Sequence, residues 1–343
     1  MSMQDATAGA SHQEAPQKTR GTDPLFEVRN LSVDYLSADG PVRAVANVSL
    51  AIRPGEVVGL AGESGSGKST LALSAARLLP AWTASVQGEV RFQGRDLLAL
   101  SREELRAIRW RKLAIVFQGA MNSLNPVTTI EHQILDTLRA HGEHEPIKAR
   151  ARARELLDLV EIRHDVLKRY PHELSGGMRQ RAVIAIALAF HPDLLLMDEP
   201  TTALDVVVQR QILTRLLRLQ EALGFAVMFI THDISVLLEL CDRIAVMYGG
   251  RLVEMAPADV ILEQPRHPYT KGLLRSFPSL TGPKTRLSGV PGSPPSLRHL
   301  PAGCAFHPRC PLAIDRCRTA VPELREIGTD HLTACHRAEE EQE

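Results

Sequence analysis

A glycine-rich stretch, GESGSGKST, occupies Gly62 to Thr70 and lies between a run of β-forming residues and a helical segment. Glycines in such a turn let successive backbone N–H groups face a phosphate, and the start of the following helix adds positive potential. A lysine can then reach the β- and γ-phosphates, while a hydroxyl can hold Mg²⁺. A glycine-rich turn without a ligand is the simpler alternative, but the lysine, the hydroxyl and both flanking elements favour a nucleoside triphosphate site. We predict that this site contains Gly62, Glu63, Ser64, Gly65, Ser66, Gly67, Lys68, Ser69 and Thr70.

Two adjacent acids end the apolar run LLLMDEP, which begins at Leu194. Asp198 could hold the water shell of Mg²⁺, and Glu199 could polarise the water that attacks the terminal phosphate. Two neighbouring acids at a strand end are often only a solvated edge or a helix cap. The catalytic interpretation is favoured here because a phosphate-binding loop requires an acidic partner at such a position. We therefore predict Asp198 as a metal-binding residue and Glu199 as the general base.

A second candidate anion site lies in LSGGMRQR, which begins at Leu174 and opens another helical segment. Ser175 supplies a hydroxyl, and Gly176 and Gly177 leave backbone N–H groups accessible at the helix start. An isolated Ser-Gly-Gly is more commonly a mere helix cap. One nucleotide does not need two such cradles from one chain. We therefore predict that two chains pack head to tail, so that the first cradle of one and the second cradle of the other bind the same γ-phosphate.

Two kinds of β pattern surround these motifs. The stretches FEVRNLSVDY from Phe26 and SVQGEVRFQG from Ser85 alternate, which predicts strands of a partly exposed antiparallel sheet. Residues between 131 and 189 carry apolar side chains at helical spacing. Four further runs are apolar on both faces, as is typical of a buried parallel sheet: VVGLAG, LAIVFQ, LLLMDE and AVMFITH. The sequence therefore predicts an α/β fold in which strand ends position the candidate site.

The composition changes after about Pro257, where prolines and glycines crowd the stretch SGVPGSPPSLRHLPAG. Such a stretch is typical of a linker or an irregular extension. We predict a disordered polar tail at 1–24, a catalytic domain at 25–260, and a C-terminal module at 261–343 that contains four of the five cysteines.

The overall charge and the apolar runs exclude other classes. The 343 residues have a formal net charge of zero, which gives no support for a nucleic-acid binder. The longest apolar run, AVIAIALAF, has nine residues, whereas a transmembrane helix needs about 20. The N-terminus lacks the apolar core of a signal peptide. We expect a cytosolic chain whose membrane role depends on a partner.

Taken together, the motifs resemble those of the ATP-binding cassette (ABC) ATPases, over about 25–260. Besides the stretches above, the resemblance implies that Tyr35 stacks on adenine, Gln118 is the Q-loop glutamine and His232 is the switch histidine. It also places Asp205 at the end of the D-loop, TALD, which begins with Thr202 where the family more often has serine. The family's fold is a RecA-like P-loop NTPase core with an antiparallel β subdomain and an inserted helical subdomain. Its Mg²⁺ site would contain Ser69, Gln118 and Asp198.

The branch that the chain resembles is the oligopeptide/dipeptide importers, in particular their D-type ATPase subunit. NSLNP from Asn122, HPYTKGLL from His267 and the terminal cysteines carry this resemblance. Gly119 and Ala120 replace the more frequent Asp-Pro in the segment that meets the permease. The resemblance implies a second ATPase subunit (a paralogue or a second copy), two membrane permeases on whose cytoplasmic face the chain lies, and, indirectly, an extracytoplasmic substrate-binding protein. The function implied is ATP-driven import of peptides.

Rival functions stay open at this point. A single P-loop and the short interval between Gln118 and Ser175 weigh against tandem translation factors and coiled-coil repair proteins. A soluble non-transport ATPase, and import of nickel or another non-peptide solute, are the main alternatives. A non-hydrolysing regulatory subunit is disfavoured by the intact Glu199 and His232.

The four terminal cysteines follow the spacing Cys304-x5-Cys310-x6-Cys317-x17-Cys335. Stable disulfides are rare in the cytosol, so the thiols indicate a metal site or chance. Structural zinc sites usually contain tight C-x2–4-C pairs, which are missing here, and four thiolates suit a [4Fe–4S] cluster at least as well. The importer resemblance implies the iron–sulfur cluster, with zinc and unligated thiols as alternatives. We expect His307 and His336 to be bystanders and Cys241 to be a core thiol.

Overall fold

The structure is a computed structural model that describes residues 23–201, 204–276 and 289–338. Nearly all of the predicted N-terminal tail, and Thr202 of the predicted D-loop, lie outside the described residues.

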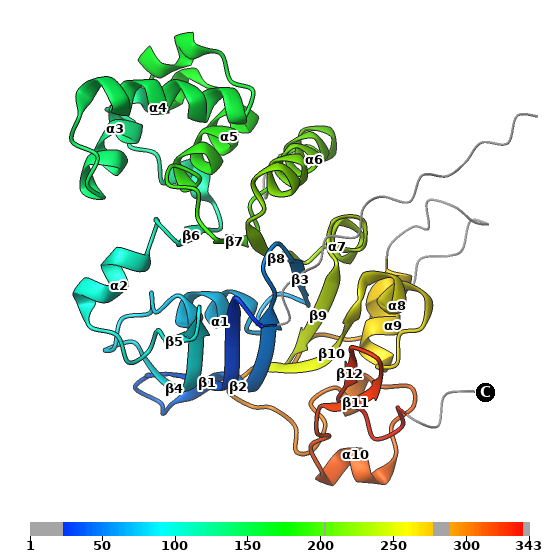
Figure 1. The fold of residues 1–343 in the computed structure, drawn as a ribbon. Coiled ribbons are helices and arrows are strands. Elements are labelled where there is room, and N and C mark those ends of the chain that lie inside the picture. The colour runs from blue at the N-terminus through cyan, green and yellow to red at the C-terminus, as the bar shows by residue number, and fades with distance from the viewer. Residues whose placement is uncertain (1–22, 202–203, 277–288, 339–343) are drawn as a thin grey trace, which may run out of the picture.

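An antiparallel sheet forms the lower part of the molecule in Figure 1. Its strands are β1 (Phe26–Tyr35), β2 (Val42–Ile52), β4 (Ala84–Phe92) and β5 (Arg95–Asp96), in the order β2-β1-β4-β5. Buried and more exposed side chains alternate along much of β1, as expected for a sheet with one packed face. The antiparallel sheet predicted from the two alternating stretches is thereby confirmed.

The central sheet has eight strands in the order β11-β12-β10-β9-β3-β8-β7-β6. The four runs predicted as buried parallel strands form β3 (Val57–Ala61), β6 (Leu113–Val116), β7 (Leu194–Asp198) and β8 (Ala226–Ile230). These four are neighbours and run parallel, with β9 (Arg243–Tyr248) parallel to β3 on the other side. All five residues of β3, of β7 and of β8 are buried, which explains their unbroken apolar sequences.

Helix α1 (Lys68–Ala75) follows β3 and lies between the two sheets, where it contacts β1, β2 and β7. Its Leu71, Ala72 and Ala75 belong to the apolar cluster that joins the antiparallel sheet to one face of the central sheet. The opposite face of the central sheet packs against α6 (Val206–Leu223) and α7 (Ile234–Leu240). The phosphate-binding loop therefore starts at a buried strand and ends at a buried helix.

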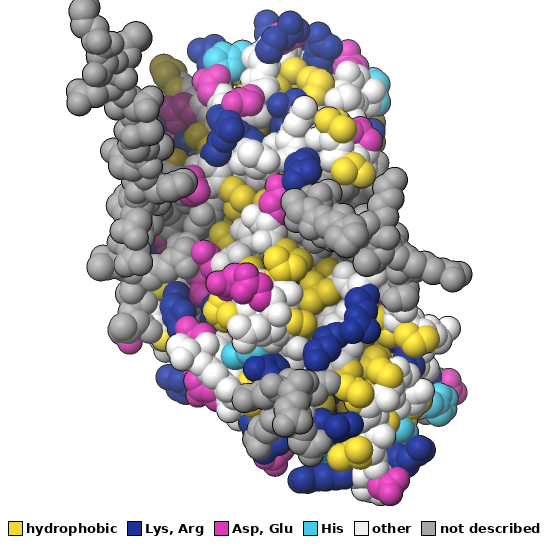
Figure 2. Space-filling model, turned by 90° about the vertical axis from the view of Figure 1, so that its right-hand side faces the viewer, with side chains coloured by type: hydrophobic (Ala, Val, Ile, Leu, Met, Phe, Trp, Pro, Cys, Tyr) yellow, Lys and Arg dark blue, Asp and Glu magenta, His cyan; other side chains and the backbone are white. Residues whose placement is uncertain are grey.

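A helical lobe stands apart from the sheets at the top of Figure 1. It contains α3 (Ile130–Ala140), α4 (Pro146–Leu159) and α5 (Gly176–Ala187), with three short 3₁₀ helices at Ala120–Asn122, His164–Lys168 and Pro171–Glu173. Thr129 caps α3, and the side of α3 that contains Ile134 and Leu138 is buried. On the face shown in Figure 2, acidic, basic and apolar side chains are interspersed.

Helix α2 (Arg102–Ile108) begins with a capping box in which Ser101 and Glu104 bond each other's backbone N–H groups. Leu105 and Ile108 are its buried residues. This short helix is therefore amphipathic, with its remaining side chains toward the surface.

The C-terminal residues extend the central sheet instead of forming a detached module. β10 (Arg251–Pro257) is antiparallel to β9, and it also pairs with β12 (His331–Thr333), which in turn pairs with β11 (Arg325–Gly328). The remaining elements there are α8 (Ala258–Glu263), α9 (Pro268–Arg275), the 3₁₀ helix His307–Arg309 and α10 (Asp315–Thr319). The boundary placed near 260 remains a prediction, but one sheet crosses it.

A buried contact between a carboxylate and a histidine fixes this extension. Glu254 of β10 is fully buried, and its Oε1 lies 2.8 Å from Nε2 of His331 on β12. The same carboxylate accepts the backbone N–H groups of Arg266 and His267 at 2.6 and 3.1 Å. A buried charge needs such partners, so Glu254 ties β10 to both β12 and the start of α9.

Within the described residues, every helix is too short or too polar to cross a bilayer.

The helical lobe offers a matched test of its own packing. Ile134 is fully buried on α3, whereas Ile147 on α4 is 79% exposed. We predict that Ile134→Ala lowers the free energy of unfolding by about 2–5 kcal/mol, because it removes buried methyl groups and leaves a cavity. Ile147→Ala should change it by less than about 0.5 kcal/mol. Urea unfolding followed by circular dichroism measures both, and equal effects would contradict this packing.

Candidate ATP-binding site

The phosphate-binding loop folds against backbone from both sheets. Gly62, Gly65 and Gly67 have φ values of +146°, +79° and +102°, which side chains rarely permit. A Cβ at Gly62 would collide with the carbonyl oxygen of Met247 on β9, and one at Gly67 with the carbonyl oxygen of Ala44 on β2. Gly62 and Gly67 are therefore required by both conformation and close approach, and Gly65 by conformation alone.

Lys68 lies at the centre of this loop. Its buried Nζ donates hydrogen bonds to the carbonyl oxygens of Gly62 and Glu63 at 2.7 and 2.9 Å, and to Ser66 Oγ at 3.4 Å. Burial lowers the pKa of Lys68, while the nearby acids, Glu199 first among them, oppose that shift. An ammonium held in this way can exchange loop carbonyls for phosphate oxygens.

Asp198 is the last residue of β7, and one of its carboxylate oxygens is available to a ligand. Its Oδ1 is buried and has no hydrogen-bond partner among the described residues. Burial raises the pKa of Asp198, and a hydrogen bond with the Ser69 side chain opposes that shift. A carboxylate oxygen and a hydroxyl are the hard oxygen ligands that Mg²⁺ prefers, so these residues fit the predicted ion.

Glu199 is held between two of the predicted site residues. Its Oε2 accepts a hydrogen bond from Gln118 Nε2 at 2.9 Å, and its Oε1 lies 3.1 Å from His232 Nδ1. Its φ of +44° is unusual for a residue with a side chain. The structure thus brings Gln118, Glu199 and His232 together, with Gln118 bound to the carboxylate; its role at Mg²⁺ stays a prediction.

Tyr35 lies at the end of β1, next to the loop. Its hydroxyl is 3.2 Å from Thr70 Oγ1. This contact places the Tyr35 ring beside the last residue of the phosphate-binding loop, and its stacking on adenine stays a prediction.

The Ser-Gly-Gly cradle begins α5 in the helical lobe. Ser175 Oγ accepts the Met178 N–H at 3.3 Å, and a Cβ at Gly177 would come within 2.7 Å of Val208 on α6. Asp205, from the predicted D-loop, caps α6 by accepting the Val208 N–H at 2.9 Å.

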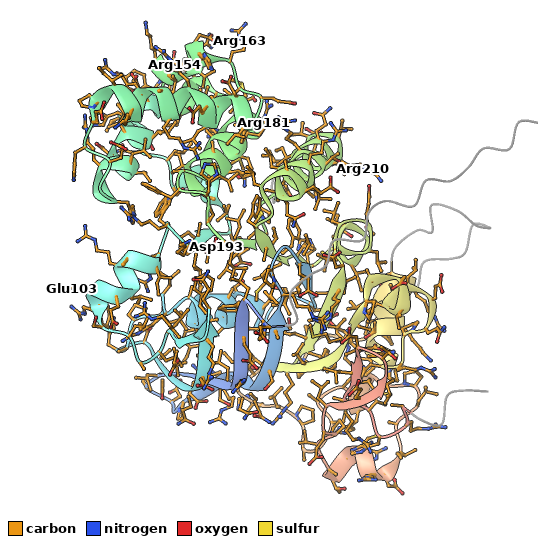
Figure 3. The ribbon with its side chains drawn as sticks, in the orientation of Figure 1. Glu103, Arg154, Arg163, Arg181, Asp193 and Arg210 are labelled. Atoms are coloured by element: carbon orange, nitrogen blue, oxygen red, sulfur yellow. The ribbon has the colours of Figure 1, made fainter. Side chains whose placement is uncertain are left out.

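These residues line an open hollow of about 870 Å³ between α5 and α6. Arg181 on α5 and Arg210 on α6, labelled in Figure 3, line it as well. None of the described residues that line it comes from Gly62 to Thr70. Within one chain, the two anion cradles therefore form separate sites.

The four terminal cysteines meet in one place. Cys304, Cys310, Cys317 and Cys335 line a single small cavity, and burial raises the pKa of Cys304 and of Cys335 to about 11. Cys241 is buried in the core of the ATPase region, as expected. Among the described residues, no three His, Cys, Asp or Glu side chains stand ready to hold a single metal ion.

The two nearby histidines have backbone partners. His307 Nδ1 lies 3.0 Å from the carbonyl oxygen of Cys304, and His336 Nε2 lies 2.9 Å from that of Ala320. Each bond occupies only one nitrogen of its ring, so the expectation that both histidines are bystanders stays a prediction.

One contact of the phosphate-binding loop was missed by sequence reasoning. Arg309 of the C-terminal module donates to both carboxylate oxygens of Glu63, at 2.6 and 3.0 Å. The hydroxyl of Tyr269 accepts the Glu63 N–H at 2.8 Å. Residues 246 positions apart carry no local signal of such a pair, and Tyr269 was noted only as part of the HPYTKGLL motif.

Family models match both parts of the chain. The model described as ABC transporter matches residues 45–202, and the model described as Oligopeptide/dipeptide transporter, C-terminal region, matches residues 253–317. In solved structures, the dimeric bacterial ABC transporter cassette MJ0796 is 33% identical with a TM-score of 0.61, over 68% of this chain and 98% of that one. The structure of its post-hydrolysis dimer bound to ADP and Pi is 32% identical with a TM-score of 0.60, again over 68% of this chain and 98% of that one. Fold and site together define an ABC ATPase.

Two relatives show the branch. A probable peptide ABC transporter ATP-binding protein, y4tR of Sinorhizobium fredii, is 47% identical over 94% of this chain and 98% of its own length. The oligopeptide transport ATP-binding protein OppD of Mycobacterium tuberculosis is 49% identical over 92% of this chain and 52% of its own length, so this chain spans about half of that relative. The chain belongs to the oligopeptide/dipeptide importer family of ABC transporter ATP-binding proteins. It is the ATP-hydrolysing subunit of a peptide importer.

The position of Glu199 generates a test of its role. We predict that Glu199→Gln binds ATP but hydrolyses it about 10²–10⁴-fold more slowly, because the amide cannot accept a proton from the attacking water. Phosphate release and equilibrium nucleotide binding measure the two properties. Glu103→Gln, on exposed α2 in Figure 3, is the matched control and should hydrolyse ATP normally. Near-normal turnover by Glu199→Gln would remove Glu199 from the mechanism.

Proposed function

We propose that this subunit hydrolyses ATP at sites shared between two ATPase subunits, each of which provides one half. The observation that carries this proposal is the separation of the two anion cradles. Gly62 to Thr70 lies between the sheets, whereas Ser175 to Gly177 lies at the open hollow on the helical lobe. A head-to-tail partner can place its Ser-Gly-Gly turn opposite the first cradle. The dimeric MJ0796 cassettes support this arrangement.

Within such a site, each group has a role that its position supports. Lys68 and the loop N–H groups bind the β- and γ-phosphates, and Tyr35 stacks on adenine. Ser69 and Asp198 would hold Mg²⁺, which neutralises charge on the phosphates when bound. Glu199 accepts the proton of the attacking water, while His232 and Gln118 hold its carboxylate in place.

The contact with the membrane partner is proposed at the Q-loop. An apolar groove of about 410 Å³ lies between β6 and α5 and is lined by Trp110, Phe117, Leu124, Val183 and Ile186. Phe117 is 42% exposed and immediately precedes Gln118, which contacts Glu199. A permease helix in this groove would be coupled to the catalytic carboxylate through two consecutive residues. Closure of the ATPase dimer would then move the helical lobes together with the permeases.

We propose that the assembly contains a second ATPase subunit (a paralogue or a second copy), two permeases and, indirectly, an extracytoplasmic substrate-binding protein. The described helices are not suited to span a bilayer, so the chain would attach to the cytoplasmic face of the membrane through its partners. The ATPase domain would comprise 25–260 and the C-terminal module 261–343.

The four cysteines are proposed to hold a [4Fe–4S] cluster. Thiolates ligate both zinc and iron–sulfur clusters, so the donor set fits either group. Sulfur ligands of one zinc ion lie about 3.8 Å apart because each Zn–S bond is about 2.3 Å. A four-iron cluster is larger than a single ion and would hold its thiolates farther apart. When bound, the cluster would cross-link a short module that has little core of its own.

The shared ATP site can be tested by blocking the partner's half. We predict that Ser175→Arg binds ATP but neither dimerises on ATP addition nor hydrolyses it, because the arginine fills the place of the partner's γ-phosphate. Light scattering with ATP and phosphate release measure these properties. Ser85→Arg introduces the same side chain at an exposed position of β4 and should behave as wild type. Full hydrolysis by Ser175→Arg would contradict the shared site.

The nature of the cysteine site follows from metal analysis. Chain purified without oxygen should contain iron and acid-labile sulfide, and Cys304→Ser should lose both. Cys241→Ala removes a buried thiol outside the four and should retain them. Stoichiometric zinc without sulfide would establish a zinc site instead.

A further inference from the structure

The C-terminal module places a cation directly behind the phosphate-binding loop. Besides both oxygens of Glu63, Arg309 bonds the Tyr248 hydroxyl at 3.2 Å. The side chain of Arg309 is 7% exposed and that of Glu63 is 25% exposed. Arg309 also donates to the backbone carbonyls of Val290, Pro291 and Gly292, at 3.2, 2.7 and 3.2 Å.

Glu63 is an unfavourable residue for a loop that binds a polyphosphate. It is the second residue of the glycine-rich stretch, and its own carbonyl oxygen accepts a bond from Lys68 Nζ at 2.9 Å. The negative charge of Glu63 raises the pKa of Lys68, although less than the charges of Glu199 and Asp198 do. An unpaired carboxylate there would repel the phosphates and compete with them for Lys68. The forked guanidinium of Arg309 matches the carboxylate and compensates its charge.

We propose that Arg309 is a positioning residue of the ATP site: it neutralises and fixes Glu63, so the C-terminal module sets the affinity of the phosphate-binding loop for ATP. This inference rests on the proposed assignment of Gly62 to Thr70 as that loop. It gives the module a direct role in nucleotide binding, whatever group its cysteines hold.

Removing the arginine should weaken ATP binding. In the full-length Glu199→Gln chain, which preserves ATP during the measurement, Arg309→Ala should raise the Kd for MgATP by about tenfold, from the repulsion of one uncompensated charge at short range. Raising the salt concentration should reduce the difference. With Glu199 intact, Arg309→Ala should raise KM far more than it lowers kcat.

The decisive variant removes both charges. The double variant Glu63→Gln/Arg309→Ala also lacks the arginine of the module, but its loop has no carboxylate. Its Kd for MgATP should therefore return to within about threefold of that of the parent. Arg309→Lys keeps the positive charge but loses the bidentate geometry of the guanidinium. Its Kd for MgATP should lie between those of the parent and of Arg309→Ala. Arg316→Ala removes a charge from exposed α10 and is the matched control.

The outcomes separate the possibilities. If the double variant binds as poorly as Arg309→Ala, Arg309 only supports the module's structure and the inference is wrong. It is equally wrong if Arg309→Ala binds ATP as well as Arg316→Ala does. If Lys68→Ala binds ATP as tightly as the parent, the loop assignment itself fails and this inference fails with it.

Discussion

The site depends on how closely the phosphate-binding loop approaches the backbone around it. The carbonyl oxygens of Met247 on β9 and Ala44 on β2 occupy the space that side chains at Gly62 and Gly67 would need. The loop is thereby clamped between the central sheet and the antiparallel sheet, and Lys68 is directed into its centre. Since β7 and β8 are also strands of the central sheet, Asp198, Glu199 and His232 reach the same loop from neighbouring strand ends. A shift between the two sheets would change the close approach of Gly67 to the carbonyl oxygen of Ala44.

The two anion cradles of the chain form separate sites, as the proposed shared ATP site requires. The helical lobe presents Ser175 to Gly177 toward the open hollow beside α6. Gln118 links the two regions, because it follows β6 of the sheet, bonds Glu199 and precedes the first 3₁₀ helix of the lobe. In the proposed mechanism, movement of the lobe would reach the Glu199 carboxylate through Gln118. Such a link would allow ATP hydrolysis to drive a partner in the membrane.

Much of this could be predicted from local sequence. Unbroken apolar runs identified β3, β6, β7 and β8, because strands buried on both faces need no polar residues. The same runs placed Asp198 and Glu199 at a strand end. Long-range pairing was not readable, since β9 and β10 were not predicted and nothing local signals that β12 pairs with β10.

The pair between Glu63 and Arg309 shows the same limit more sharply. It joins residues 246 positions apart, and neither residue is unusual in its own neighbourhood. The hydrogen bond from Gln118 to Glu199 was likewise unforeseen, although both residues had been assigned to the site. Side-chain partners across a fold depend on packing geometry that residue spacing does not encode.

The added strands at the C-terminal end of the central sheet have a consequence for solubility. Without β12, β10 would be an edge strand, and the backbone that now pairs with β12 at Glu254 and Met255 would be unpaired. Exposed edge strands can pair with strands of other molecules, which leads to aggregation. In the intact chain the edge strand is β11, which has four residues and begins with Arg325 and Glu326. The cysteine-bearing extension therefore covers part of the edge of β10 at which a strand of another molecule could pair.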